Sequence, residues 1–166
     1  MDFDEVSLKK YGFEGFIQIG ALKRQLCKKL PLVALPKHKG VYVVFKRARN
    51  RPRFLDEGTG GWFPRKKPKN PNVPVNILEE KWIDGAQVIY IGQTKTLRHR
   101  IKTRLLFGMK KPVGAWGGRY IWQFKDADKL LIAWKETSDG NPCEVERKLI
   151  DYFKRIYGRL PFANLR

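Results

Sequence analysis

The chain is poor in metal-binding side chains and has no long apolar run. Its 166 residues include two cysteines, Cys27 and Cys143, and two histidines. The cysteines form no Cys-x-x-Cys pair, so a tetrahedral zinc site cannot be assembled convincingly. We expect both to be reduced thiols in a cytoplasmic protein, with a structural disulfide as the alternative. No apolar run approaches the roughly 18 residues of a membrane span, and the acidic start of the chain is unlike a secretory signal.

Negative charge is also scarce. There are 16 Asp and Glu residues against 35 Lys and Arg, which gives a formal net charge of +19. The segment from Gly85 to Lys125 contains nine basic residues and no acidic one, whereas the last 41 residues are nearly balanced. Charge concentrated in this way predicts a surface for a polyanion, and we favour nucleic acid. An anionic membrane surface is the alternative, which would require an amphipathic basic helix.

Local patterns predict a single α/β (α+β) domain over residues 1–166, with a small antiparallel sheet flanked by helices. We expect an N-terminal helical extension over residues 1–38 and a long insertion over residues 46–84, between the first two strands. Apolar spacing and end signals predict helices at 19–30, 96–107 and 141–157, and strands at 40–45, 88–91, 120–124 and 130–134.

The insertion has an unusual composition for the interior of a domain. It contains five prolines and the basic cluster Arg65, Lys66, Lys67 and Lys69. Trp62 and Phe63 precede this cluster, and mixed aromatic and cationic residues are typical of surfaces that bind nucleic acid strands. A disordered basic loop is the equal alternative. We expect one short helical turn at 77–82.

Four side chains stand out chemically. Glu146 lies three and seven residues before Leu149 and Phe153, so it borders the buried face of the last helix. A carboxylate there requires a metal ion or a partner such as a buried arginine. Tyr42 and Tyr90 lie in predicted strands, where tyrosine is common, and Arg100 taken alone indicates a phosphate contact or a salt bridge.

Taken together, these residues resemble the GIY-YIG nuclease superfamily. Gly40-Val41-Tyr42 and Tyr90-Ile91-Gly92 correspond to its two strand motifs. Arg100 stands at the place of the family's catalytic arginine, Glu146 at that of its metal-binding glutamate, and Asn164 at that of its late asparagine. The resemblance extends over residues 39–164, outside the insertion. The tyrosines are 48 positions apart, further than is usual in the family, and Gln93 and Arg104 replace a common lysine and a common histidine or tyrosine.

The resemblance implies metal-assisted hydrolysis of DNA phosphodiester bonds. Glu146 would hold Mg²⁺ or Mn²⁺, Arg100 would brace the phosphate, and Tyr42 or Tyr90 would activate the water, with Tyr42 favoured. A free tyrosine titrates near 10, so this role requires nearby cations that lower its pKa. No small-molecule cofactor is expected. The residues predicted to contact DNA are Gln93, Lys95, Arg98, His99, Lys102, Arg104, Lys110 and Lys111, with Arg65, Lys66 and Lys67 of the insertion.

Two other functions remain open at this stage. The Gln93 and Arg104 departures favour a catalytically inactive nucleic-acid-binding module with the same fold. A basic ribosome-associated factor would prefer RNA over DNA. The oligomeric state is also open, because a monomer would nick one strand and a dimer would cut both.

Overall fold

The protein is a mixed α/β domain built on one four-stranded antiparallel sheet, as the sequence predicts. The computed structural model describes residues 2–62 and 66–165. The strands lie in the order β1-β4-β2-β3. Their bounds are Glu14–Gln18 (β1), Gly40–Phe45 (β2), Val88–Thr94 (β3) and Leu131–Glu136 (β4).

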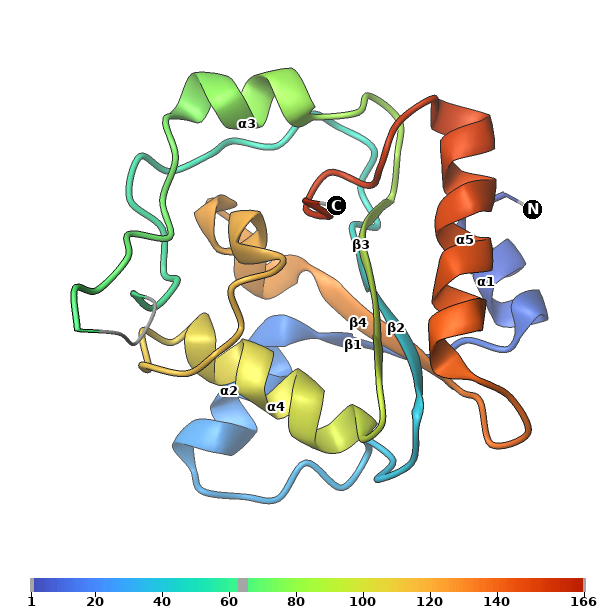
Figure 1. Ribbon diagram of the computed structural model, residues 1–166. Helices are drawn as coiled ribbons and strands as arrows, with labels where there is room; N and C mark the ends of the chain where they lie inside the picture. The colour runs from blue at the N-terminus through green and yellow to red at the C-terminus, as the bar shows by residue number, and fades with distance from the viewer. Residues whose placement is uncertain (1, 63–65, 166) are drawn as a thin grey trace.

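Helices cover both faces of the sheet (Figure 1). Helices α1 and α5 lie on one side, and α2 and α4 lie on the other, together with the 3₁₀ turns η1 and η2. None of the helices in the described part of the chain is long and apolar enough to cross a membrane. The bounds are Glu5–Tyr11 (α1), Ile19–Cys27 (α2), Val75–Lys81 (α3), Leu97–Phe107 (α4), Arg119–Gln123 (η1), Ala127–Lys129 (η2) and Pro142–Tyr157 (α5).

An irregularity in β3 places the two motif tyrosines on the same face of the sheet. Val44 pairs with Tyr90 and Phe45 pairs with Val88, so the register shifts by one residue between them. Val88 therefore packs toward α5, whereas Tyr90 packs with Tyr42 on the opposite face. In a regular strand, residues two apart would share a face. β2 and β3 pair directly with each other, despite the long insertion between them.

The N-terminal region is not the purely helical extension that the sequence predicted. Residues 14–18 form β1, which pairs with β4 and completes one edge of the sheet. The helix predicted to reach residue 30 ends at Cys27. β1 is hard to detect from sequence because Gly15 and Phe16 both adopt a left-handed backbone conformation. These residues interrupt the simple alternation by which a strand is recognised.

The prediction of a strand at residues 120–124 is wrong, because this segment forms the 3₁₀ turn η1. β4 already pairs with β1 on one side and β2 on the other, so no position beside it is free for another strand. Gly118 enters η1 with a φ of 81°. The aromatic and apolar residues of this segment are buried all round, and burial without alternation mimics a core strand.

The predicted boundaries of α5 are nearly those observed. The Asn141 side chain accepts a hydrogen bond from the Cys143 backbone at 2.9 Å, Pro142 opens the helix, and Gly158 ends it with a φ of 74°. These are local signals that need no tertiary contact.

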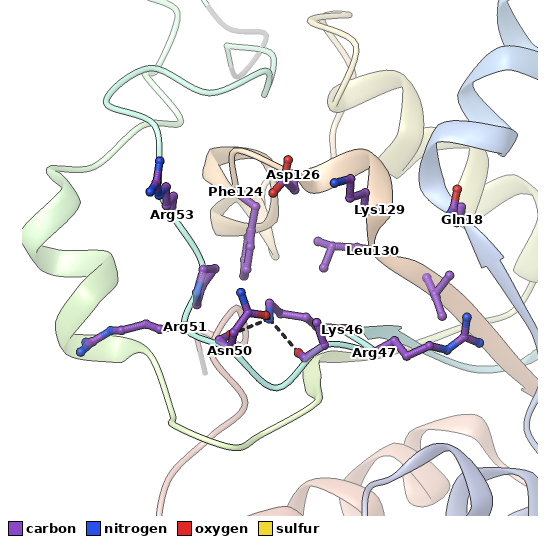
Figure 2. A pocket seen from close by; sticks show the side chains of 13 residues that line it. Gln18, Lys46, Arg47, Asn50, Arg51, Arg53, Phe124, Asp126, Lys129 and Leu130 are labelled. Atoms are coloured by element: carbon purple, nitrogen blue, oxygen red, sulfur yellow. Dashed lines mark hydrogen bonds between the residues drawn. The ribbon is translucent and has the colours of Figure 1, made fainter.

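Several residues of the insertion pack on the domain, whereas residues 47–51 and 66–70 are exposed. Phe54 stacks on Phe162 at 5.5 Å and contacts Phe124 edge-on at 5.2 Å, while Trp82 completes this aromatic cluster. At its start, the Lys46 ammonium donates to the carbonyl oxygens of Ala48 and Asn50 and to the Asn50 side chain, at 2.6–2.9 Å (Figure 2). The predicted helical turn is present as α3. The disordered-loop alternative concerns the basic stretch from Trp62 to Lys69, of which residues 63–65 lie outside the described part of the chain, and it stays a prediction.

Candidate functional site

The centre of the candidate site is a buried arginine held by two tyrosines. The Arg104 guanidinium donates hydrogen bonds to the hydroxyl oxygens of Tyr42 and Tyr90 and to the backbone carbonyl of Gly117. Tyr42 is 1% exposed, Arg104 5% and Tyr90 8%. The tyrosine ring centroids lie 5.9 Å apart. We call these three side chains the tyrosine–arginine cluster.

Two glycines are required for this packing. A Cβ at Gly92, which lies opposite Tyr42 in the sheet, would approach the Tyr42 ring to 2.7 Å and the Tyr90 ring to 2.8 Å. A Cβ at Gly118 would lie 2.9 Å from the Arg104 guanidinium. Gly92, the final glycine of the second strand motif, is therefore required for steric reasons, because the two tyrosine rings fill the space that a side chain would occupy.

The electrostatics of the cluster favour the neutral phenol at Tyr90. Burial raises the pKa of Tyr90, the adjacent Tyr42 adds to the rise, and the positive charges of Arg104 and Arg100 oppose it. The net shift is upward, so the predicted lowering of the tyrosine pKa by nearby cations does not occur at Tyr90. The Tyr90 hydroxyl, which accepts from Arg104, keeps its own proton available for donation.

The arginine in this cluster is Arg104 rather than Arg100. Arg100 is half-buried, and its guanidinium donates to the Gly114 carbonyl at 3.2 Å. Its charge still acts on Tyr90. Sequence reasoning placed Arg104 among the DNA contacts, although a signal for burial was present. Arg104 lies seven residues after Leu97 and three after Ile101, on the apolar stripe of α4.

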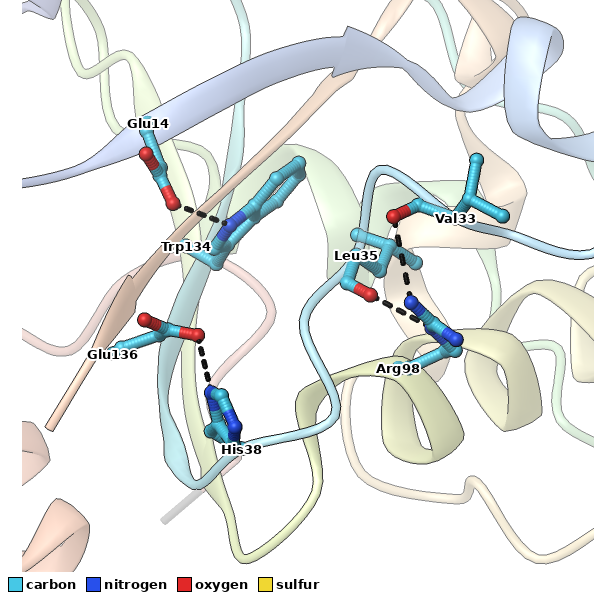
Figure 3. A network of polar contacts seen from close by, with 7 residues as sticks. All are labelled: Glu14, Val33, Leu35, His38, Arg98, Trp134 and Glu136. Carbon is cyan, nitrogen blue, oxygen red and sulfur yellow. Dashed lines mark hydrogen bonds and ion pairs between the residues drawn. The ribbon is translucent and has the colours of Figure 1, made fainter. Parts of the chain in front are cut away.

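The N-terminus of α4 is covered by the chain that precedes β2. The backbone N–H groups of Leu97 and Arg98 donate to His38 and Pro36 carbonyls at 2.9 and 3.0 Å. Thr96, the residue before the first turn of α4, makes no side-chain hydrogen bond to the helix. The Arg98 side chain donates to the Leu35 carbonyl at 2.7 Å and to that of Val33 (Figure 3). This arginine, predicted to contact DNA, therefore anchors a loop.

Glu146 lies half-buried on the second turn of α5. Burial raises the pKa of its carboxyl, and the positive charge of Arg104 opposes the rise. Among residues 2–62 and 66–165, its carboxylate makes no hydrogen bond or salt bridge. The structure thus couples Glu146 to a buried arginine through space, without the direct ion pair that the alternative interpretation requires.

Glu146 is the side chain of this site that could hold a hard divalent cation. In the described ranges no cluster of three or more histidine, cysteine, aspartate or glutamate side chains is suited to hold a metal ion. Mg²⁺ is commonly held by one or two carboxylates with water and substrate phosphate, and Glu146 offers one uncommitted carboxylate. A closed protein cage for zinc does not fit these residues.

Asn164 is a structural partner of β3. Its side chain accepts from the Ile91 backbone N–H and donates to the Ile91 carbonyl, both at 2.9 Å. Ala163 adds a backbone bond to Ile89 at 2.8 Å. The C-terminal segment thereby covers the outer edge of β3 between the two motif residues Tyr90 and Gly92. Asn164 is 8% exposed, so its amide groups are committed to the sheet.

The predicted DNA contacts differ in exposure, and Arg104 is the buried one among those described. Gln93 is half-buried and lines an open groove with Lys95, His38 and Lys39 at the start of α5. His38 Nδ1 lies 2.8 Å from a Glu136 carboxylate oxygen (Figure 3). Arg65 and Phe63 lie outside the described residues. The remaining predicted contacts are exposed: Lys66, Lys67, Lys95, His99, Lys102, Lys110 and Lys111.

A separate cavity of about 430 Å³ lies at the start of the insertion. Five basic residues line it, but three have partners in the protein. Lys46 is bound within its loop, Arg47 pairs with Glu5 at 2.5 Å, and Arg51 donates to the Glu79 carbonyl. Figure 2 shows Arg47 and Arg51 directed outward to opposite sides. The Arg47 pair ties the insertion to α1, whereas the other two contacts lie within the insertion.

Comparisons of the chain with protein-family models, with curated proteins and with solved structures give no match. Functional inference for this protein therefore depends on the site itself.

Proposed function

We propose that this protein is a metal-dependent endonuclease of the GIY-YIG type that hydrolyses phosphodiester bonds in DNA. One observation carries the proposal: the Arg104 guanidinium donates hydrogen bonds to both Tyr42 and Tyr90. The charge of the same guanidinium also acts on the carboxyl of Glu146. Buried polar groups and a carboxylate with a perturbed pKa are typical of catalytic sites.

Each residue has a distinct proposed role. Glu146 would hold Mg²⁺ or Mn²⁺, which when bound would neutralise charge on the scissile phosphate. Arg100, half-exposed beside the cluster, would bind the phosphate oxygens through its planar donors. Tyr90 retains its proton and would act as a hydrogen-bond donor, and Tyr42 would orient the attacking water. Arg104 would position both phenols.

The test is a plasmid-nicking assay with three proteins. Supercoiled DNA is incubated with wild type, Glu146→Gln and Glu144→Gln, with and without Mg²⁺. Glu144 is exposed in the first turn of the same helix and serves as the matched control. We expect metal-dependent nicking by wild type and Glu144→Gln, and a loss of at least about 10²-fold for Glu146→Gln. Equal cutting by all three proteins would contradict the assignment of Glu146.

One observation favours a second candidate, a nucleic-acid-binding module without catalysis. The Arg104 side chain occupies both phenol oxygens, and all three side chains are at least nine-tenths buried. This module would give a salt-sensitive DNA shift but no cutting of plasmid, branched or single-stranded DNA with either Mg²⁺ or Mn²⁺. That result would replace the endonuclease proposal.

A further inference from the structure

The insertion and the loop after α4 together form a second feature, a cavity with an exposed tryptophan. Trp62 is 48% exposed, which is unusual for so large an apolar side chain. It lines a cavity of about 350 Å³ with Gly60, Gly61, Pro68, Lys110 and Pro112. This volume is at the lower end for small-ligand pockets and suits one planar group.

Backbone hydrogen bonds hold the walls of the cavity. Gly61 donates to the Phe107 carbonyl at 2.7 Å, and Lys110 donates to the Thr59 carbonyl at 3.2 Å. A Cβ at Gly61 would lie 2.3 Å from the Lys111 carbonyl oxygen. The two segments are therefore in direct contact, and the cavity is part of the folded domain.

The surroundings of the cavity are strongly basic. Five exposed lysines lie in the two segments, and their ammonium groups make no hydrogen bond or ion pair within residues 2–62 and 66–165. Glu57 is the acidic residue among those lining the cavity. The lysines are Lys66, Lys67, Lys69, Lys110 and Lys111. Such a surface is complementary to a phosphate backbone.

A continuous path connects this surface with the tyrosine–arginine cluster. The Lys69 ammonium lies 4.7 Å from the centre of the Trp116 ring, and the Arg119 guanidinium lies 4.3 Å from it. The next residue, Gly117, accepts the hydrogen bond from Arg104. A strand that crosses the lysines would therefore reach the proposed catalytic residues along the segment 116–118.

We propose that the Trp62 cavity binds an unpaired base of a DNA strand, with the base stacked on the indole and its phosphates on the lysines. This inference rests on the proposed function and adds a substrate class: single-stranded, gapped or branched DNA. An intact duplex cannot supply such a base, because each base is covered on both faces by its neighbours. Stacking on an aromatic side chain accepts any base, whereas the lysines supply affinity.

The test measures binding in EDTA, so that cleavage does not contribute. Fluorescence anisotropy is recorded for wild type, Trp62→Ala, Trp62→Phe and Ile156→Ala, with a labelled oligothymidine and a duplex of equal length. Ile156 is 47% exposed on α5 and is the control for loss of a surface apolar group. Stacking contributes about 1–3 kcal/mol per base, so Trp62→Ala should weaken single-strand binding by roughly 5- to 150-fold.

The other measurements define the result further. We expect Trp62→Phe to retain part of the affinity, and duplex binding to change less than about twofold in every variant. A thermal melt of each variant checks that the fold is retained. Unchanged single-strand binding by Trp62→Ala, with tight duplex binding by all proteins, would overturn this inference and leave the proposed function intact. No DNA binding by wild type would overturn both.

A further experiment tests whether the surface at Trp62 binds an anionic membrane instead of DNA. Wild type and Trp62→Ala are titrated with vesicles that contain anionic lipid. A Trp62-dependent response to vesicles, without one to oligothymidine, would identify a membrane surface as the partner and overturn the proposal.

Discussion

At the scale of single residues, the decisive feature is the buried arginine at the centre of the candidate site. Arg104 has phenol oxygens and a backbone carbonyl as its acceptors. Arginine can donate to three separated acceptors because its five donors are fixed in a plane and spread over three nitrogens, whereas the three donors of lysine diverge from a single nitrogen. The same charge acts on Tyr90 and Glu146, where it opposes the rise in pKa that burial causes.

Replacing this arginine should cost much of the protein's stability. Arg104→Leu leaves two phenol oxygens and the Gly117 carbonyl without their donor, and each orphaned buried group costs about 1–3 kcal/mol. We expect the free energy of unfolding to fall by about 3 kcal/mol or more. Arg100→Leu, the matched control, should change it by less than about 1 kcal/mol. Urea denaturation measures both, and similar losses would contradict the central place of Arg104.

The carboxyl of Glu146 should destabilise the fold at neutral pH. Because its pKa is raised in the folded state, the ionised form carries a penalty that is absent below its ordinary value of 4.5. Stability is lost as the pH rises from that value through the raised pKa. Glu146→Gln should therefore melt at a higher temperature than wild type at pH 7, and this gain should disappear at pH 4. A lower melting temperature at pH 7 would instead indicate a stabilising pair with Arg104.

At the scale of elements, the edge strand β3 depends on a side chain from the C-terminal segment. Antiparallel strands at a sheet edge leave backbone groups unpaired, and such groups need a partner. The backbone N–H and carbonyl groups of Ile91 both bind the side-chain amide of Asn164. The family resemblance assigns this asparagine to the site, whereas the geometry gives it a positioning role for the strand that carries Tyr90.

Asn164→Ala should loosen this edge without removing catalytic chemistry. Two hydrogen bonds in a buried setting contribute about 1 kcal/mol each, so the free energy of unfolding should fall by about 2 kcal/mol. Hydrogen exchange at the Ile91 amide should accelerate more than at Val43, in the central strand β2. Asn76→Ala, an exposed change on α3, is the control. Lost DNA cutting with unchanged exchange at Ile91 would show that Asn164 acts on the substrate directly.

At the scale of the whole molecule, the dominant property is the net charge of +19. Three salt bridges occur in the described part of the chain, so most cationic side chains there have no acidic partner. The exposed lysines occur on several elements, including the insertion, α4 and the loop after it. Such a distribution favours long-range attraction of a polyanion over recognition of a particular sequence.

DNA binding should accordingly depend steeply on salt. For duplex DNA, log K falls with log salt at a slope of about −0.9 for each phosphate neutralised. We expect a slope of about −4 or steeper between 50 and 200 mM salt, and a shallower one when Lys110 and Lys111 are both changed to Gln. Anisotropy titrations at four salt concentrations measure it. RNA of equal length is the comparison, and a clear preference for RNA would favour the ribosome-associated alternative.

Local patterns in the sequence were sufficient for several elements. The strands β2 and β3 are short apolar runs, and α5 has an asparagine cap, a proline and a terminal glycine. These predictions succeeded because strand periodicity and helix capping act between residues close in the chain.

Other features required the tertiary structure. The sequence analysis missed β1 and η1. The edge of β4 is paired with β1, which lies more than 110 residues earlier in the chain, and no local sequence pattern indicates so distant a pairing. The sequence by itself determined the fold class, the basic character and the motif residues. Only the tertiary structure decided that Arg104 contacts both tyrosines, that Arg98 and Asn164 bind backbone, and that the insertion packs on the domain. The physical reason is that burial and hydrogen-bond partners depend on contacts between distant segments, which become definite when the chain folds.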